Sequence, residues 1–388
     1  MKIVIAPQAF KGSISAMEVS KAIQEGVINV FPDSEIILCP VADGGDGTLE
    51  TLVESTGGSI NETTVTGPIG SPVRALWGAM GDQKTAVIEM ARTSGLALLT
   101  LDERDPLNAT TFGLGEIILS ALDAGFRDFI IGIGGSATND AGAGMAQALG
   151  IRLLDKTNTE ISVGGAALQN LRTIDISKLD NRILNSDFQV ACDVNNPLTG
   201  PEGAAAIYGP QKGASKQQID ILDKALSNLS SIIKKDIGKE VSEIPGAGAA
   251  GGLGAGIMAF MDGNLRTGVD IVLDKVGLDS LLDSADLVIT GEGGLDFQTV
   301  YDKAPIGVAK MAQKKQIPTI AISGMLGKDF HVVHAHGIEA AVSLTNGPMS
   351  LEEASDNAYN LIKECAEESL RLISVGMKLN KNYPTNIM

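Results

Sequence analysis

The sequence of 388 residues has little cysteine, histidine, aromatic side chain or positive charge. Its three cysteines, Cys39, Cys192 and Cys365, are far apart and form no C-x-x-C pattern, so neither a zinc site nor a disulfide framework is indicated. Lys and Arg number 30 against 47 Asp and Glu, which gives a formal net charge of −17. We therefore expect no binding of nucleic acid or of an anionic membrane surface through a positive field.

Long hydrophobic runs are absent as well. No stretch approaches the roughly 18 apolar residues that cross a bilayer, and the apolar run in MKIVIAPQAFKGS is too short for the core of a signal peptide. We expect a cytoplasmic protein with reduced thiols, present as a monomer or a homodimer.

Apolar residues, at 44%, and 46 glycines are abundant, which suits large cores joined by many tight turns. At both ends of the chain, short apolar runs alternate with amphipathic helical patterns, as in βαβ units. The expected strands are 2–6, 35–39, 285–290, 318–323 and 340–344, and the expected helices are 16–30, 47–55, 304–315 and 351–373. Together they predict an α/β fold with a flavodoxin-like doubly wound parallel sheet.

The middle of the chain has a different pattern. Alternating segments at 62–65, 73–80 and 84–90, separated by turn signals, predict an antiparallel meander. Helices and further strands follow it. We expect a discontinuous flavodoxin-like domain, 1–65 with 279–388, and an inserted mixed α/β domain at 66–278.

A glycine-rich turn, Gly134-Gly135-Ser136-Ala137-Thr138, lies between an expected strand at 129–133 and an expected helix at 141–149. Backbone N–H groups at such a helix entry can bind an anion. Tight packing of helix on sheet, with Thr138 or Asp140 as N-cap, explains the same residues. No acidic residue clearly ends the next strand, so the turn is a poor dinucleotide fingerprint and NAD is not expected.

A second glycine-rich stretch, at 245–256, also fits G-x-G-x-x-G, but no convincing strand precedes it. We favour a flexible loop that covers phosphates at Gly248–Gly254 over a close-packed helix entry. The G-x-x-x-x-G-K-[ST] pattern is absent, so an ATP-using protein with this sequence is not a P-loop enzyme.

Carboxylates follow strand ends or glycine turns in four places. One such residue would most often be an N-cap or turn residue, but four predict a polar cleft at the carboxyl ends of the strands. Carboxylates there can bind Mg²⁺ or accept a proton from a hydroxyl. The residues are Asp43 with Asp46, Asp140, Asp193, and Glu292 with Asp296.

Two lysines differ from the others, which lie mostly on polar helix faces. Lys11 and Lys212 stand in expected loops beside glycine, in Phe10-Lys11-Gly12 and Gln211-Lys212-Gly213. A loop lysine of this kind can neutralise a phosphate or a carboxylate, although a solvated surface lysine would have the same sequence context.

Long segments spread over nearly the whole chain resemble, in this order, the bacterial glycerate kinase family. They are IAPQAFKGSISAMEV, PVADGGDGT, DPLNATTFGLGE, GIGGSATNDAGAGM, ACDVNNPLTGPEGAAAIYGPQKGA, PGAGAAGGLGAG, ADLVITGEGGLD, KAPIGVA and GPMSLEEA. The resemblance implies two α/β domains with a cleft between them. It also implies that ATP and Mg²⁺ are used to phosphorylate D-glycerate, with 2-phosphoglycerate as the usual product of this branch and 3-phosphoglycerate as the alternative.

The chain departs from the family pattern in three places. Gln8-Ala9 replaces the usual Asp-Ser, Gly294 replaces an Arg, and Asp302 replaces a Gly. The alternative hypothesis is therefore a homologue that binds hydroxy acids or nucleotide without catalysis.

The residues and the resemblance together lead to a hypothesis about the site. Asp193 is expected to be the base, and Lys11 and Lys212 the catalytic cations. Substrate contacts are expected from Ser13, Asp43, Asp46 and Asp296. The phosphates of ATP are expected at Gly134, Gly135, Ser136, Thr138, Gly248 and Gly251, and Mg²⁺ at Asp43 and Glu292.

Overall fold

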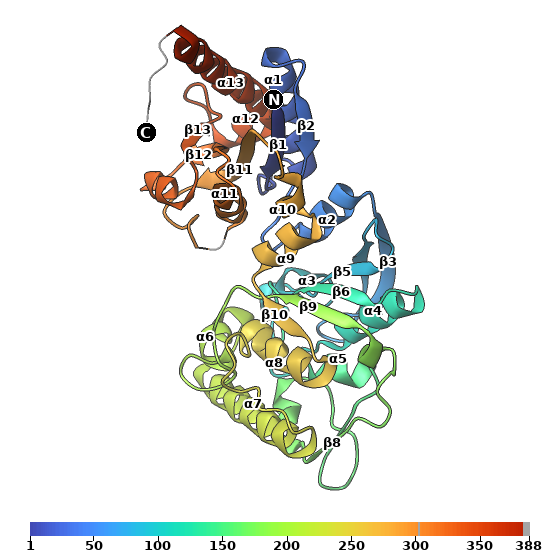
Figure 1. The fold of residues 1–388 in the computed structure, drawn as a ribbon. Coiled ribbons are helices and arrows are strands. Elements are labelled where there is room, and N and C mark those ends of the chain that lie inside the picture. Colours follow the sequence, from blue (N-terminus) through green and yellow to red (C-terminus); the bar gives the residue numbers. More distant parts are fainter. Residues whose placement is uncertain (302, 383–388) are drawn as a thin grey trace. The chain divides into compact units, whose positions relative to one another are not determined.

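The computed structural model describes residues 1–301 and 303–382. The chain forms two compact units. The first combines Met1–Asp43 with the chain from Val272 onward, and the second is Gly44–Ile271 (Figure 1). The expected boundaries are 65/66 and 278/279, and the first differs because the expected first segment includes a strand that pairs with the second sheet.

The first unit contains a five-stranded parallel sheet in the order β13-β12-β11-β1-β2. Its strands are β1 (Lys2–Pro7), β2 (Glu35–Leu38), β11 (Leu287–Leu295), β12 (Thr319–Leu326) and β13 (Ala340–Ser343). Its helices are α1 (Ala16–Val30), α10 (Leu278–Leu281), α11 (Ala304–Lys314), α12 (Leu351–Asp356) and α13 (Ala358–Asn382). The strand order is that of a flavodoxin-like sheet, so the predicted fold class of this part is confirmed.

Helices cover both faces of this sheet. One apolar core lies under α1 and α13, and another lies under α11. The helices α1 and α13 pack side by side (Figure 1). A Cβ atom on Gly26 of α1 would lie 2.6 Å from the carbonyl oxygen of Lys363, so only glycine permits this approach.

Two elements of the first unit differ from expectation. The single closing helix expected at 351–373 is interrupted at Asn357, and a capping box of Ser350 and Glu353 starts its first part. The strand β11 continues through Glu292 and Gly294, where the pattern predicted a turn, because its partner β12 extends alongside it.

The second unit is built on a six-stranded mixed sheet in the order β10-β9-β6-β5-β4-β3. Strands β3, β4 and β5 form the predicted antiparallel meander, and β6, β9 and β10 continue the sheet in parallel from β5. The strands are β3 (Ser59–Thr66), β4 (Pro72–Ala79), β5 (Thr85–Glu89), β6 (Asp128–Gly132), β9 (Asp187–Ala191) and β10 (Asn264–Arg266), with a separate pair β7 (Arg152–Leu154) and β8 (Thr173–Asp175). The predicted mixed α/β architecture is confirmed, and β3 belongs here because it pairs with β4 along its whole length.

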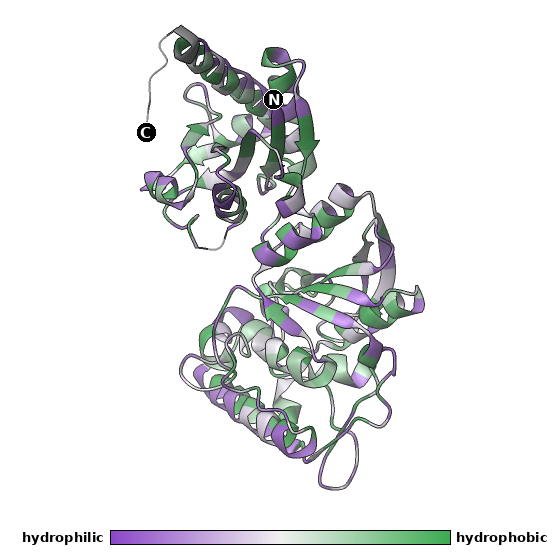
Figure 2. Ribbon diagram, viewed as in Figure 1, coloured by the Kyte–Doolittle hydropathy of each residue, from purple (hydrophilic) through white to green (hydrophobic). Residues whose placement is uncertain are grey.

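Helices surround this sheet and share one large apolar core with it. They are α2 (Thr48–Thr56), α3 (Ala91–Ser94), α4 (Phe112–Asp123), α5 (Ala143–Ala148), α6 (Ala204–Tyr208), α7 (Lys216–Asp236) and α8 (Ala249–Met261), with α9 (Gly268–Lys275) across the boundary of the two units. Hydrophobic and hydrophilic residues alternate along α7 (Figure 2). Its buried residues, which include Leu222, Leu226 and Leu229, recur at helical spacing.

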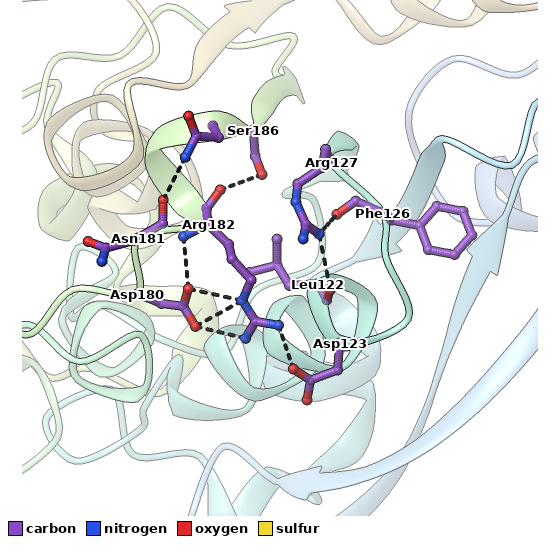
Figure 3. A network of polar contacts seen from close by, with 9 residues as sticks. Leu122, Asp123, Phe126, Arg127, Asp180, Asn181, Arg182 and Ser186 are labelled. Carbon is purple, nitrogen blue, oxygen red and sulfur yellow. Dashed lines mark hydrogen bonds and ion pairs between the residues drawn. The ribbon is translucent and has the colours of Figure 1, made fainter.

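Short 3₁₀ segments complete the chain: η1 (Leu96–Leu98), η2 (Leu101–Glu103), η3 (Gly165–Asn170), η4 (Ile183–Asn185), η5 (Pro210–Lys212) and η6 (Phe330–His336). Beside η4, Arg182 joins the connection before β9 to the end of α4 (Figure 3). Its Nε bonds Asp180 at 3.0 Å and its Nη1 bonds Asp123 at 2.6 Å. These contacts tie the segment that leads into β9 to a helix of the same unit.

Candidate functional site

One pocket of the second unit has a volume of about 360 Å³ and lies at the carboxyl ends of β6 and β9. Open α/β sheets bind ligands at this edge. Its lining comes from the turn after β6, the segment after β9, the α6–η5 region and the start of α8. The lining residues are Gly44, Gly45, Leu96, Ile133, Gly134, Gly135, Ser136, Ala191, Cys192, Asp193, Val194, Tyr208, Gln211, Lys212, Ala249 and Ala250.

The glycine turn after β6 contributes backbone donors to this pocket. Gly135 has φ +71°, and a Cβ atom on it would lie 3.2 Å from Cβ of Ala91, so glycine is favoured here. Across the described part of the chain, no group accepts a hydrogen bond from the backbone N–H of Gly134 or Gly135. Both residues line the pocket, so their N–H groups are candidates for binding an anion.

Lys212 is the cation of this pocket, although its side chain is only 1% exposed. Its Nζ donates to Ser136 Oγ at 2.7 Å and to the Thr138 carbonyl oxygen at 2.7 Å. Burial lowers the pKa of Lys212 to about 7, and the negative charge of Asp140 partly opposes this effect. A buried ammonium that lines a pocket is suited to hold an anion.

Asp140 is completely buried behind the turn. Its Oδ2 accepts hydrogen bonds from the backbone N–H of Thr111 at 2.9 Å, from Thr111 Oγ1 at 2.8 Å and from Gly144 N at 3.2 Å. Its Oδ1 accepts from Gly142 N at 3.2 Å. Burial raises the pKa of Asp140, while these four donors favour the ionised form.

Asp193 follows β9, lines the pocket and is exposed. Its Oδ1 accepts a hydrogen bond from the backbone N–H of Gly268 at 2.9 Å, at the first residue of α9. Next to it, Cys192 donates its thiol to the Val194 carbonyl oxygen at 3.4 Å, and burial raises the pKa of this thiol. The sequence-predicted Asp193, Lys212, Gly134, Gly135 and Ser136 thus line one pocket.

Thr138 lies behind the pocket lining, completely buried. Its carbonyl oxygen accepts from Lys212, and its Oγ1 has no hydrogen-bond partner among the described residues. It therefore positions Lys212 from behind.

The interpretation of Gly248–Gly254 as a flexible loop is wrong. These residues form the buried, kinked start of α8, with positive φ at Ala250, Gly251 and Gly252. A Cβ atom on Gly251 would lie 2.0 Å from the carbonyl oxygen of Thr138. Here the glycines serve close packing, and Ala249 and Ala250 reach the pocket in place of Gly248 and Gly251.

The acidic segment after β2 spans the boundary of the two units. Asp43 is half-buried and ends the first part of unit one, while Asp46 is exposed and lies in unit two. Between them, Gly44 and Gly45 line the pocket. Gly44 has φ +89°, and a Cβ atom on it would lie 2.7 Å from Cα of Gly268, so the backbone here can only be glycine.

An ionic cluster that the sequence reasoning missed fixes the start of α2 beside this segment. Glu89, at the end of β5, accepts from the backbone N–H of Leu49 at 3.1 Å and from Arg92 Nε at 2.7 Å. Arg92 Nη2 also binds Glu50 at 2.7 Å. An acidic residue ending the expected strand at 84–90 was the available signal, of the same kind that singled out Asp193.

In the first unit, Glu292 lies on β11 and is 7% exposed. Thr299 Oγ1 donates to its Oε1 at 2.9 Å, and Lys303 Nζ donates to its Oε2 at 3.4 Å. Burial raises the pKa of Glu292, Lys303 and Thr299 oppose this effect, and the charge of Asp43 adds to it. In 1–301 and 303–382 no group of three or more His, Cys, Asp or Glu side chains is arranged to hold a metal ion. Asp43 and Glu292 are two carboxylates close enough for their charges to interact.

A second pocket, of about 250 Å³, lies at the carboxyl ends of the strands of the first unit. Lys11 and Ser13 line it, and Ser13 Oγ donates to the Ser355 carbonyl oxygen at 3.1 Å. Asp296 instead closes a local turn, because its Oδ1 accepts from Gln298 N at 2.7 Å. Lys11 and Lys212 thus belong to pockets of different units.

The structure describes the surroundings of two of the departures from the family pattern, Gln8 and Gly294. The buried Oε1 of Gln8 accepts no hydrogen bond from the described residues, whereas Gln8 N donates to the Gly291 carbonyl oxygen at 2.8 Å. A Cβ atom on Gly294 would meet only Cγ of Met325, at 3.5 Å, so a side chain fits there. Asp302 lies outside the described residues.

Over the described length of the chain, no helix is both long enough and apolar enough to cross a membrane.

Comparisons with known proteins agree over the whole length. A family model described as "Glycerate kinase family" matches residues 3–374. Glycerate kinase from Bacillus subtilis (strain 168) is 51% identical over 98% of this chain and 99% of its own. Glycerate 2-kinase from Escherichia coli (strain K12) is 49% identical over 97% of this chain and 99% of its own. A solved structure from Salmonella typhimurium LT2, assigned to glycerate kinase 2, has a TM-score of 0.91 and 47% identity, and covers 97% of this chain and 99% of its own.

Proposed function

Because this chain belongs to the glycerate kinase family, we propose that it transfers the γ-phosphoryl group of ATP to a hydroxyl of D-glycerate and forms 2-phosphoglycerate. The predicted family and enzyme class are thereby confirmed, while the nucleotide, the metal ion and the product belong to the proposal. The observation that supports it best is the pocket of the second unit. There a buried ammonium and backbone donors line one cavity with the exposed carboxylate of Asp193.

The polar groups of this pocket have complementary roles. The N–H groups of Gly134 and Gly135, together with Lys212, hold anionic oxygens of the phosphates or of the glycerate carboxylate. Asp193 accepts the proton of the reacting glycerate hydroxyl. The hydroxyl oxygen then bonds to the γ-phosphorus as the bond from the γ-phosphorus to the ADP oxygen breaks. The hydrogen bond from Gly268 N orients Asp193 for this step. Positioning and charge neutralisation dominate phosphoryl transfer, so these groups suffice as the protein's contribution.

Further contacts to substrate are proposed for Lys11, Ser13, Asp46 and Asp296. Asp43 and Glu292 would hold Mg²⁺, which neutralises phosphate charge when it is bound with ATP. Mg²⁺ usually takes one or two protein carboxylates and keeps several waters, so a pair of carboxylates fits it.

The direct test is ADP release in the presence of ATP, Mg²⁺ and D-glycerate, with the product identified by phosphorus NMR. We expect turnover on the order of 1–100 s⁻¹ and the phosphorus resonance of 2-phosphoglycerate. A 3-phosphoglycerate signal would overturn the proposed position of transfer. Ligand binding without turnover would instead support a non-catalytic binder, and Gln8→Asp combined with Gly294→Arg would then be the restoring variant.

A further inference from the structure

The ammonium of Lys212 has one hydrogen-bond donor more than the protein uses. An ammonium carries three N–H bonds, and two of them are taken by Ser136 Oγ and the Thr138 carbonyl oxygen. Within residues 1–301 and 303–382, no group accepts the third. Because the side chain is buried and lines the pocket, this third N–H marks a place for an oxygen of a bound anion.

A buried ammonium keeps its proton only if a negative charge compensates for the lost hydration. Asp140 provides this charge, since it is the acidic group that stabilises the ionised form of Lys212. Its carboxylate faces four hydrogen-bond donors and no acceptor. That surrounding suits an ionised carboxylate, because a protonated one would need an acceptor for its own hydrogen.

Asp140 also shapes the turn that carries the pocket donors. It stands four residues after Ser136, and it ties this segment to Thr111 and to the first residues of α5. The other titratable or charged groups near Lys212 are Asp193, Cys192 and Tyr208 in the pocket lining, and Arg104, whose Nη1 donates to the Gln211 carbonyl oxygen at 3.0 Å. Among all these groups, Asp140 is the one whose charge raises the pKa of Lys212.

We propose that Asp140 is a positioning residue that keeps the Lys212 ammonium charged and aimed into the pocket, so that this ammonium binds the anionic group of the substrate. This inference rests on the proposed function, because it takes glycerate or the phosphates of ATP as the anion. Lys212 then acts as a charged clamp, and a role as a neutral base that removes the hydroxyl proton is excluded. The two roles depend on pH in opposite ways. As the pH rises, Lys212 loses the charge that a clamp needs and gains the neutral form that a base needs.

The experiment measures the dissociation constants of D-glycerate and of inorganic tripolyphosphate, separately, by calorimetry from pH 5.5 to 9.5. For glycerate, whose carboxyl group stays ionised over this range, the affinity should be constant below about pH 7 and should fall by up to about tenfold per pH unit above it. This change of slope is called the break. Tripolyphosphate gains negative charge over the same range, so its affinity is divided at each pH by the affinity for Lys212→Met. The probe whose curve then shows the break identifies the anion.

In Asp140→Asn the break should move to lower pH, and a displacement of one unit would weaken binding about fivefold at pH 7. Asp262→Asn is the matched control. Asp262 also pairs with a lysine, Lys239, but is 94% exposed and lies outside the pocket, so its binding curve should match wild type. Thr111→Val shows what a purely structural disturbance of the turn does. It removes one donor to Asp140 but keeps the carboxylate, so it should weaken binding equally at all pH values.

A charge-conserving variant and a measurement of proton uptake complete the experiment. If Asp140→Asn does not fold, Asp140→Glu keeps the charge and should leave the break in place, so a break that moves in this variant overturns the proposal. In wild type at pH 8, binding should take up about 0.9 proton for each ligand, and Lys212→Met should abolish this uptake. An unchanged break in folded Asp140→Asn contradicts the proposal, and so does tighter binding of glycerate at higher pH. If neither probe binds wild type and ATP is not turned over, the proposed function itself fails.

Discussion

At the scale of single residues, the proposed role of Lys212 and the stability of the fold oppose each other. Burial lowers its pKa from an ordinary 10.5 to about 7, which corresponds to a free-energy cost on the order of 5 kcal/mol. This cost is fully present below about pH 7, where the lysine is charged in both the folded and the unfolded chain. It falls as the pH rises toward 10.5, because the unfolded chain then holds the proton more strongly than the folded one.

We therefore expect Lys212→Met to raise the free energy of unfolding by about 2–4 kcal/mol at pH 6, after allowance for the two acceptors that lose their donor. The gain should shrink between pH 7 and 10. Urea denaturation at several pH values measures it. If the free energies of unfolding of the two proteins changed in parallel with pH, the pKa of Lys212 would not be lowered in the folded chain.

Asp193 offers a second test at this scale. Asp193→Asn should lower turnover by about 10²–10⁴-fold, the usual contribution of a general base. The amide oxygen can still accept from Gly268 N, so stability should change little. Asp187→Asn, at the opposite end of β9, is the matched control and should turn over at the wild-type rate. Turnover of Asp193→Asn within a few-fold of wild type would remove Asp193 from the role of base.

At the scale of elements, the kinked start of α8 supports the pocket from behind. Gly251 packs against the carbonyl group of Thr138, and the same carbonyl oxygen accepts from Lys212. The helix entry and the glycine turn after β6 thus meet at one peptide group. A side chain at this point would disturb both the packing and the position of the ammonium.

Gly251→Ala should accordingly destabilise the protein by about 3 kcal/mol or more, because the new methyl group would lie 2.0 Å from the Thr138 oxygen and the backbone has φ +72°. The control is Gly376→Ala on α13, where a Cβ atom meets nothing within 4 Å. That variant should be as stable as wild type or about 0.5–1 kcal/mol more stable. Thermal unfolding of both variants checks the pair, and equal stabilities would contradict the packing argument.

At the scale of the whole molecule, the two units have separate sheets and separate apolar cores. The second unit is one continuous stretch of chain, with its pocket lined entirely by its own residues. Units with their own core can in principle fold alone. The proposed division of the chain into domains is therefore open to a direct experiment.

We expect residues 44–271, produced alone, to fold and to unfold in a single cooperative calorimetric transition. The fragment 66–278, cut at the boundaries expected from sequence, serves as the comparison. It should be much less stable, because it loses β3 from the edge of the sheet and the whole of α2. A broad, non-cooperative transition in the 44–271 fragment would contradict this division.

The sequence by itself determined the local elements of this protein. Apolar periodicity and turn residues identified β1, β2 and β6 within a residue or two of their observed bounds, because these patterns act over one strand or helix. Long matching segments also predicted the family, and strand ends identified the turn at Gly134 and the carboxylate Asp193.

Only the tertiary structure decided which of these residues meet. Lys212 bonds residues 74 and 76 positions away in the chain, and Glu89 fixes an amide 40 positions away. No local pattern records such pairings. For the same reason, the glycines at 248–254 could be interpreted as a loop. Their packing against Thr138 exists only once β6 and α8 have come together, because glycine allows both a free loop and a close approach of two backbones.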